Sequence, residues 1–174
     1  ELRPQARAGL PTLLLPWRDA GIITAVRINA LESEGHDDLA AAMKAGAQVI
    51  VYPMAETPDQ IRALDIAITD WEAKLKLQTG STPILPVCET ALGVADVRVI
   101  AAASQRVRAA LMGTEDLASN LCAERTPEGD ELDHARRRFI LECRAAHIEP
   151  IDAPYTYGDT EGAVHEARYA KRLG

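Results

Sequence analysis

The sequence predicts an α/β fold built on a parallel sheet, because short apolar segments alternate with segments of helical periodicity along the chain. The apolar segments are continuous, which is typical of strands covered on both faces. A length of 174 residues, 47% of them hydrophobic, suits one domain with a buried core. Five strand-and-helix units fit an open doubly wound sheet or part of an eight-stranded barrel.

The expected strands share an uninterrupted run of apolar, often β-branched residues. They cover residues 22–28, 47–53, 84–88, 107–112 and 149–153. Apolar residues at helical spacing predict helices over residues 4–15, 37–45, 94–104, 115–120, 130–146 and 160–172. A further helix starts after the second strand, where Thr57 is the N-cap, Pro58 takes the first helical position and Gln60 completes a capping box.

Charge and motif content argue against several classes of protein. The formal net charge of −7 disfavours a broad nucleic-acid-binding surface, which needs clustered Lys and Arg. The densest basic run, residues 136–138, follows Glu131 and Asp133 at helical spacing, so we expect a solvated, salt-bridged helix face. No glycine-rich phosphate-binding motif follows a strand, and neither a membrane-spanning apolar run nor a signal peptide is visible.

The nucleophilic and metal-binding residue types exclude further chemistries. Three distant cysteines (Cys88, Cys122 and Cys143) indicate reduced thiols in a cytoplasmic protein. None of the four lysines ends an expected strand, so a Schiff-base aldolase would lack its nucleophile. The four histidines form no HExxH pair, which argues against a zinc hydrolase.

Polar side chains collect where the expected strands end, which is where parallel α/β folds carry their chemistry. These residues are Arg27, Asn29, Glu56, Glu89, Thr90, Glu115, Asp116 and Asp152. Two carboxylates 4 Å apart repel each other by about 4 kcal/mol at an effective dielectric constant of 20. Mg²⁺ would remove this repulsion, and a nearby guanidinium would stabilise the charge of an enolate. From spacing alone the same acids also serve as helix N-caps, and Arg27 could pair with a surface acid, so both interpretations stay open.

The motifs at these strand ends resemble the HpcH/HpaI aldolase and citrate lyase β-subunit family along essentially the whole chain. The matching segments are VRIN at 26–29, IVYP at 50–53, PVCETALGV at 86–94, LMGTEDL at 111–117, and ID at 151–152 ahead of DTEG at 159–162. The ETALGV and GTEDL pair is the most specific. The chain departs from the family at Met54, where relatives often carry Lys.

The resemblance implies a (β/α)8 TIM barrel of the phosphoenolpyruvate/pyruvate type, of which residues 1–174 form a single, partial lyase domain supplying about strands 3 to 7. The first two strands would precede Glu1 and the last would follow Gly174. By the motif matches, Glu89 and Asp116 would be the Mg²⁺ ligands, while Glu115 points elsewhere. Arg27 would bind the substrate and stabilise the enolate. The backbone amides around residues 92–94 (Leu92, Gly93 and Val94) would lie near the bound acid.

The activity implied by the resemblance is that of a magnesium-dependent carbon–carbon lyase. It would cleave a citryl-, citramalyl- or malyl-CoA-like 3-hydroxy-acyl thioester through a metal-bound keto-acid enolate. A class II pyruvate aldolase acting on hydroxy-keto acids, or a non-catalytic truncated barrel subunit, is the alternative. We expect a small-molecule substrate, no nucleic-acid or membrane partner, and a homo-oligomer, as a trimer or hexamer. Whether CoA or an acyl-carrier protein bears the acyl group is left open.

Overall fold

The computed structural model describes residues 2–174 and shows one five-stranded, fully parallel sheet in the order β1-β2-β3-β4-β5. The strands are β1 (Ala25–Arg27), β2 (Val49–Tyr52), β3 (Ile84–Cys88), β4 (Ala109–Met112) and β5 (Glu149–Ile151). The α-helices are α1 (Arg3–Asp19), α2 (His36–Ala45), α3 (Pro58–Leu75), α4 (Ala91–Ala95), α5 (Val97–Ala102), α6 (Thr114–Asn120), α7 (Asp133–Ala145) and α8 (Thr160–Leu173). The predicted α/β class and the place of every strand are confirmed.

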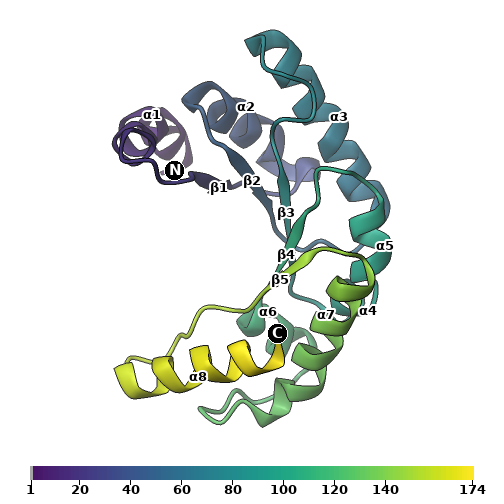
Figure 1. Ribbon diagram of the computed structural model, residues 1–174. Coiled ribbons are helices and arrows are strands. Elements are labelled where there is room, and N and C mark those ends of the chain that lie inside the picture. The colour runs from purple at the N-terminus through teal and green to yellow at the C-terminus, as the bar shows by residue number, and fades with distance from the viewer. Residues whose placement is uncertain (1) are drawn as a thin grey trace.

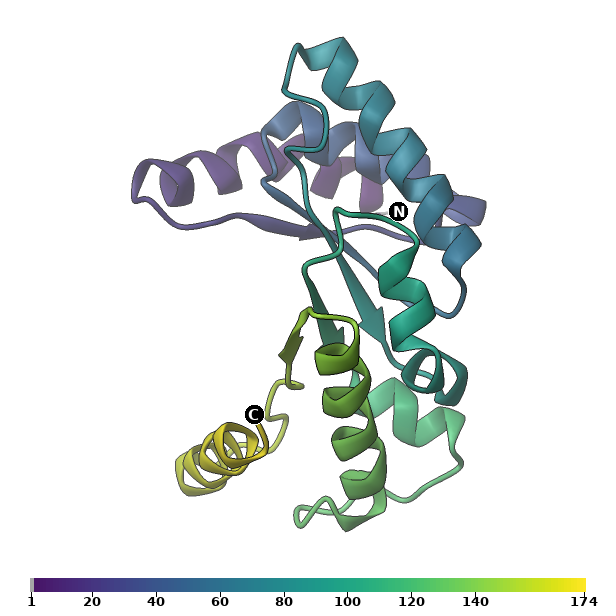
Figure 2. The ribbon, with the colours of Figure 1, turned by 45° about the vertical axis from the view of Figure 1, so that its right-hand side comes forward.

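The molecule is an open arc, with the helices on its convex side and the sheet on its concave side (Figure 1). Helices α1 and α8 lie at the two ends of the arc, and in the turned view α8 lies apart from the other helices (Figure 2). Each strand lies beside the next one in the chain, which is the strand order in the wall of a parallel α/β barrel.

The core lies between the sheet and the outer helices. Strand side chains such as Ile50, Tyr52 and Met112 are fully buried there against helix residues that include Leu64 and Phe139. Strands β2 and β4 alternate between half-buried and buried residues. Within residues 2–174 the expected cover of both faces is therefore incomplete, because the concave-face positions of β2 and β4 are only half-buried.

The half-buried concave positions are nevertheless apolar. Val51 pairs in register with Leu85, and Val87 pairs with Leu111. Val51, Leu85 and Leu111 are only half-buried, although Val87 is buried. Strands that are apolar on both faces are typical of a sheet that is covered on both faces.

The capping box that starts α3 forms as predicted. The Gln60 N–H donates to Thr57 Oγ1 at 3.4 Å, and the Thr57 N–H donates to Gln60 Oε1 at 2.9 Å. Two expected helices are interrupted instead. The one expected over 94–104 is divided into α4 and α5 at Asp96, and the one over 130–146 begins as a 3₁₀ turn, Asp130–Leu132. A kinked turn, Leu31–Gly35, in which Ser33 has non-helical angles (φ −112°, ψ −111°), precedes α2 and was not predicted.

The basic run on α7 is salt-bridged but not uniformly solvated. Arg137 pairs with Asp133 at 2.8 Å, one helical turn away, as expected for an exposed face. Arg136 is only 7% exposed, however, and its Nη2 lies 2.5 Å from Asp152 and 2.9 Å from Glu166. Arg136 thus ties α7 to the residue after β5 and to α8, and the expectation of a solvated run is wrong at this position.

A second buried ion cluster fastens α3 to the segment before β4. Arg106 is 5% exposed and its guanidinium contacts Asp65 at 2.5 Å and Glu72 at 2.8 Å. Glu72 is fully buried and also accepts hydrogen bonds from the N–H groups of Gly80 and Thr82, each at 2.8 Å.

Within residues 2–174, no helix has the length and apolar character needed to cross a membrane.

Candidate active site

A cavity of ≈ 200 Å³ opens at the carboxyl ends of the strands. Strand β1 contributes Arg27, the residue after β3 is Glu89, and the first turn of α6 supplies Asp116. Part of the wall is completed by apolar concave-face residues, the first residue of α6 and two residues of the loop after β5: Val51, Val87, Leu111, Thr114, Pro154 and Thr156. The three residues predicted as the catalytic set therefore line one cavity.

Glu89 is the most enclosed of the three. Its side chain is 3% exposed, whereas that of Arg27 is 61% exposed. Oε1 of Glu89 accepts the Met54 N–H at 2.8 Å and lies 3.8 Å from Nη2 of Arg27. The Glu89 carboxylate is thus held by one main-chain donor and one guanidinium.

Burial raises the pKa of the Glu89 carboxyl, and the neighbouring Asp116 carboxylate raises it further. The Met54 N–H and the Arg27 charge lower it, but the net direction is upward. Because the Asp116 carboxylate disfavours the charged form of Glu89, a cation bound between them would be stabilising.

The donor set fits magnesium better than a transition metal. Among residues 2–174, no group of three or more His, Cys, Asp and Glu side chains converges as a metal cage. Mg²⁺ commonly takes only one or two carboxylates and keeps water or substrate oxygens in its other positions. Glu89 and Asp116 supply this number of carboxylates, so the residues present fit Mg²⁺.

Glu115 is held differently from its neighbour Asp116. Its Oε1 accepts the Thr156 hydroxyl at 2.9 Å and the Arg125 Nε–H at 3.4 Å. Glu115 therefore ties the loop after β5 to the start of α6, while Asp116 lies beside Glu89.

The segment around Gly93 lies off the cavity. Residues 92–94 are not among the described residues that line it. The Gly93 N–H donates to Thr90 Oγ1 at 3.1 Å and the Val94 N–H to the Thr90 carbonyl at 2.9 Å, which caps α4. A role of Leu92, Gly93 and Val94 in substrate binding stays a prediction, and Gly93 and Val94 already use their amides locally.

Other polar residues expected at strand ends serve structural contacts. Asn29 donates through its main-chain N–H and its side chain to Asp38, at 2.9 and 2.5 Å. Asp152 pairs with Arg136. Neither residue lines the cavity among the described residues. Two residues that shape the site were not predicted: Met54, whose main-chain N–H binds Glu89, and Gly113, which lines the cavity. Neither acts through a chemically active side chain, which is why the sequence did not single them out.

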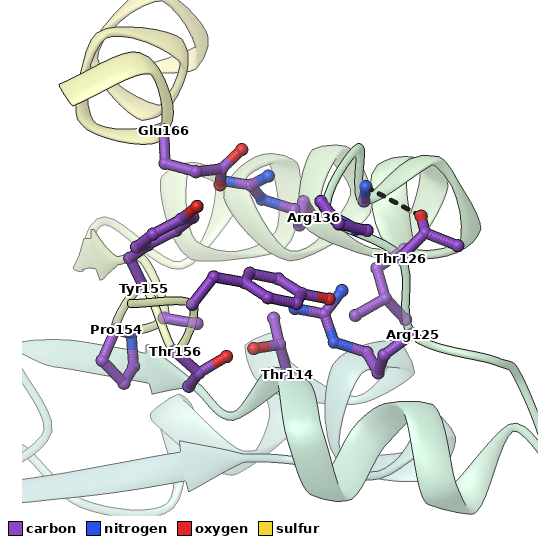
Figure 3. Close-up of a pocket in the computed structure, with 13 residues that line it drawn as sticks. Thr114, Arg125, Thr126, Arg136, Pro154, Tyr155, Thr156 and Glu166 are labelled. Carbon is purple, nitrogen blue, oxygen red and sulfur yellow. Dashed lines mark hydrogen bonds and ion pairs between the residues drawn. The ribbon is translucent and has the colours of Figure 1, made fainter. Parts of the chain in front are cut away.

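A smaller pocket adjoins the cavity and shares Thr114, Pro154 and Thr156 with it. Figure 3 shows Arg125 on one side of this pocket, with Arg136 and Glu166 on another. The Arg125 guanidinium lies 5.8 Å from the Tyr157 ring centre and forms an ion pair with Glu131 at 2.5 Å. Both arginines are paired with carboxylates, so among the described residues that line this pocket neither arginine is free to bind an anionic ligand.

Comparison with known proteins identifies the family. The profile of the HpcH/HpaI aldolase/citrate lyase family matches residues 3–174. The chain belongs to this family. It is 39% identical to the citrate lyase subunit beta of Haemophilus influenzae over 88% of this chain and 53% of the relative, and 38% identical to that of Escherichia coli over 91% and 52%. The chain spans about half the length of the curated relatives it matches.

Solved structures share the fold. RipC from Yersinia pestis superimposes with a TM-score of 0.80 at 26% identity, covering 99% of this chain and 73% of that one. The citrate lyase beta subunit from M. tuberculosis, complexed with oxaloacetate and magnesium, gives a TM-score of 0.68 at 27% identity over 87% and 64%. The predicted family resemblance is confirmed.

Proposed function

We propose that this chain is the site-bearing part of a magnesium-dependent carbon–carbon lyase that cleaves a 3-hydroxy-acyl thioester. The observation that carries the proposal is the meeting of Arg27, Glu89 and Asp116 in one cavity at the carboxyl ends of the strands. Family membership supports the reaction class. Among thioesters we favour a citryl group, because relatives named citrate lyase subunit beta are 35–39% identical and those named for malyl-CoA are 27–29% identical.

Each residue has a chemical part in this proposal. Glu89 and Asp116 would hold Mg²⁺, which when bound supplies Lewis-acid charge for the oxygens of a keto acid. Cleavage removes the proton of the 3-hydroxyl group, whose carbon becomes the carbonyl of the keto acid. The electrons of the broken carbon–carbon bond stay on the acetyl thioester as an enolate, which then takes up a proton to give the acetyl thioester. The exposed Arg27 guanidinium binds the substrate carboxylate and stabilises this charge. The apolar wall of Val51, Val87 and Leu111 lowers the local dielectric and strengthens these interactions.

We further propose that the five strands are strands 3 to 7 of a (β/α)8 barrel. The half-buried apolar positions on the concave face support this, as does the share of the curated relatives that the chain covers. Five strands do not close a barrel, so the remaining strands would complete the cavity. A homotrimer or hexamer and a cytoplasmic location stay predictions.

The decisive experiment uses the protein encoded by the complete reading frame. Purified enzyme should release a keto acid and an acetyl thioester from citryl-CoA, and EDTA should abolish this activity until Mg²⁺ is restored. Glu89→Ala should reduce kcat/KM by at least about 100-fold, the scale expected for loss of a metal-held transition state. A loss below tenfold would refute the role of Glu89.

Parallel assays separate the alternatives. Cleavage of 4-hydroxy-2-keto acids without thioester turnover would favour a pyruvate aldolase. A folded protein that binds no Mg²⁺ in calorimetry and turns over neither substrate class would be a non-catalytic subunit.

A further inference from the structure

Gly113 lies between β4 and α6, directly beside the Glu89 side chain. Its backbone angles, φ −107° and ψ 101°, are ones that any residue adopts, so conformational freedom does not explain a glycine here. A Cβ at this position would lie 2.6 Å from Glu89 Cβ and 2.7 Å from Glu89 Oε2. Space alone demands the glycine, because the Glu89 side chain lies across the place that a side chain would occupy.

The other carboxylate oxygen of Glu89 is held by the loop that follows β2. Oε1 accepts the Met54 N–H at 2.8 Å, and Met54 adopts a left-handed backbone with φ 49°. The loop that presents this amide is itself anchored, because the Ala55 N–H donates to the Val87 carbonyl at 3.0 Å. It is also tightly packed, since a Cβ on Gly93 would lie 2.5 Å from the Ala55 carbonyl oxygen.

We propose that Gly113 and the main chain of Met54 are positioning elements that direct the Glu89 carboxylate toward Asp116 and Arg27, and so set the affinity of this site for a divalent cation. The inference rests on the proposed role of Glu89 and Asp116 as ligands. Gly113 leaves the space into which Glu89 fits, and the Met54 amide fixes the rotation of the carboxylate. Groups that orient a metal ligand without touching the metal commonly change affinity or activity by about 10–100-fold.

The first test is calorimetric titration of the complete protein with MgCl₂. Gly113→Ala should weaken Mg²⁺ binding by about 10–100-fold. Gly158→Ala is the matched control, because a Cβ at Gly158 meets no atom within 4 Å, and its Mg²⁺ affinity should stay within about twofold of the wild type. Circular dichroism and thermal unfolding of the metal-free proteins establish that both variants are folded.

The outcomes separate this inference from the proposed function. If wild-type protein binds Mg²⁺ and Gly113→Ala binds it within twofold of the wild type, the positioning role of Gly113 is overturned while the metal site stands. Absence of Mg²⁺ binding by the wild type would overturn the proposed ligands, and the inference with them.

A second measurement does not depend on the folding of Gly113→Ala. Hydrogen exchange of the Met54 amide should be at least tenfold slower in the wild type than in Glu89→Ala, because only the carboxylate protects it. Equal exchange in wild type and Glu89→Ala would overturn the main-chain role of Met54.

Discussion

Asp116 and Glu115 are adjacent acids with different surroundings, which makes them a matched pair for testing the site. Asp116 lies beside Glu89, whereas Glu115 accepts hydrogen bonds from Thr156 and Arg125. Asp116→Asn should weaken Mg²⁺ binding at least about tenfold, because an amide replaces a charged ligand. Glu115→Gln should leave Mg²⁺ affinity within about threefold of the wild type. Calorimetry on both variants checks this, and a larger loss in Glu115→Gln would reverse the assignment.

At the level of single residues, the sequence predicts side chains that carry charge but not the spaces between them. Arg27, Glu89 and Asp116 follow from strand ends and motif matches, and they do meet in one cavity. Gly113 is part of a quoted motif, yet its purpose depends on how closely β3 and β4 approach at their ends. Burial of Arg136 was missed for a similar reason, because its partners Asp152 and Glu166 are distant in sequence.

At the level of elements, the Arg106 cluster should control how α3 is held against the sheet. Burial alone would raise the pKa of Glu72, but hydrogen bonds from Arg106 and from two main-chain N–H groups lower it to about 2. Because the folded-state pKa lies below the usual value of 4.5, this stabilisation is complete above pH 4.5 and is lost as pH falls toward 2. Glu72→Gln should therefore cost about 3–5 kcal/mol at pH 7, by leaving Arg106 without its buried partner.

Urea unfolding of wild type and Glu72→Gln at pH 7 and at pH 3 measures this effect. The difference in unfolding free energy between the two proteins should shrink at pH 3, because the unfolded wild type takes up a proton at Glu72 there, while folded Glu72, with a pKa of about 2, stays mostly ionised. The variant has no carboxyl at this position, so its stability lacks this pH dependence. A difference that is equal at both pH values would show that Glu72 titrates normally.

Element boundaries were predictable where local chemistry decides them, and not elsewhere. The capping box of Thr57 and Gln60 depends on residues three apart, and it forms as expected. The helices α4 and α5 are divided at Asp96, which is neither a proline nor a glycine, so the sequence gives no signal for the break. Likewise, the kinked turn before α2 was not predicted, although it brings Gly35 so close to the preceding main chain that a Cβ would lie 2.3 Å from the Asn29 carbonyl oxygen.

At the level of the whole molecule, periodicity predicts parallel βαβ units but not the curvature of the sheet. Both an open sheet and a barrel wall are compatible with strands that follow one another in order, and only the three-dimensional arrangement shows the arc (Figure 1). The concave face of this arc is apolar and half-buried at Val51, Leu85 and Leu111. Strands buried on both faces in the complete protein would account for this composition.

Leu85 tests whether the concave face is covered in the complete protein. It lies in the middle strand and does not line the cavity among the described residues, so its replacement leaves the proposed site intact. In a closed barrel Leu85→Ala should lower the unfolding free energy by about 2–5 kcal/mol, the cost of a cavity in a packed core. Ile66→Ala is the control: Ile66 is 66% exposed on α3, so this change should cost less than about 0.5 kcal/mol. Chemical denaturation of both variants of the complete protein measures the two costs, and a Leu85→Ala cost below about 1 kcal/mol would mean that the concave face remains open to solvent.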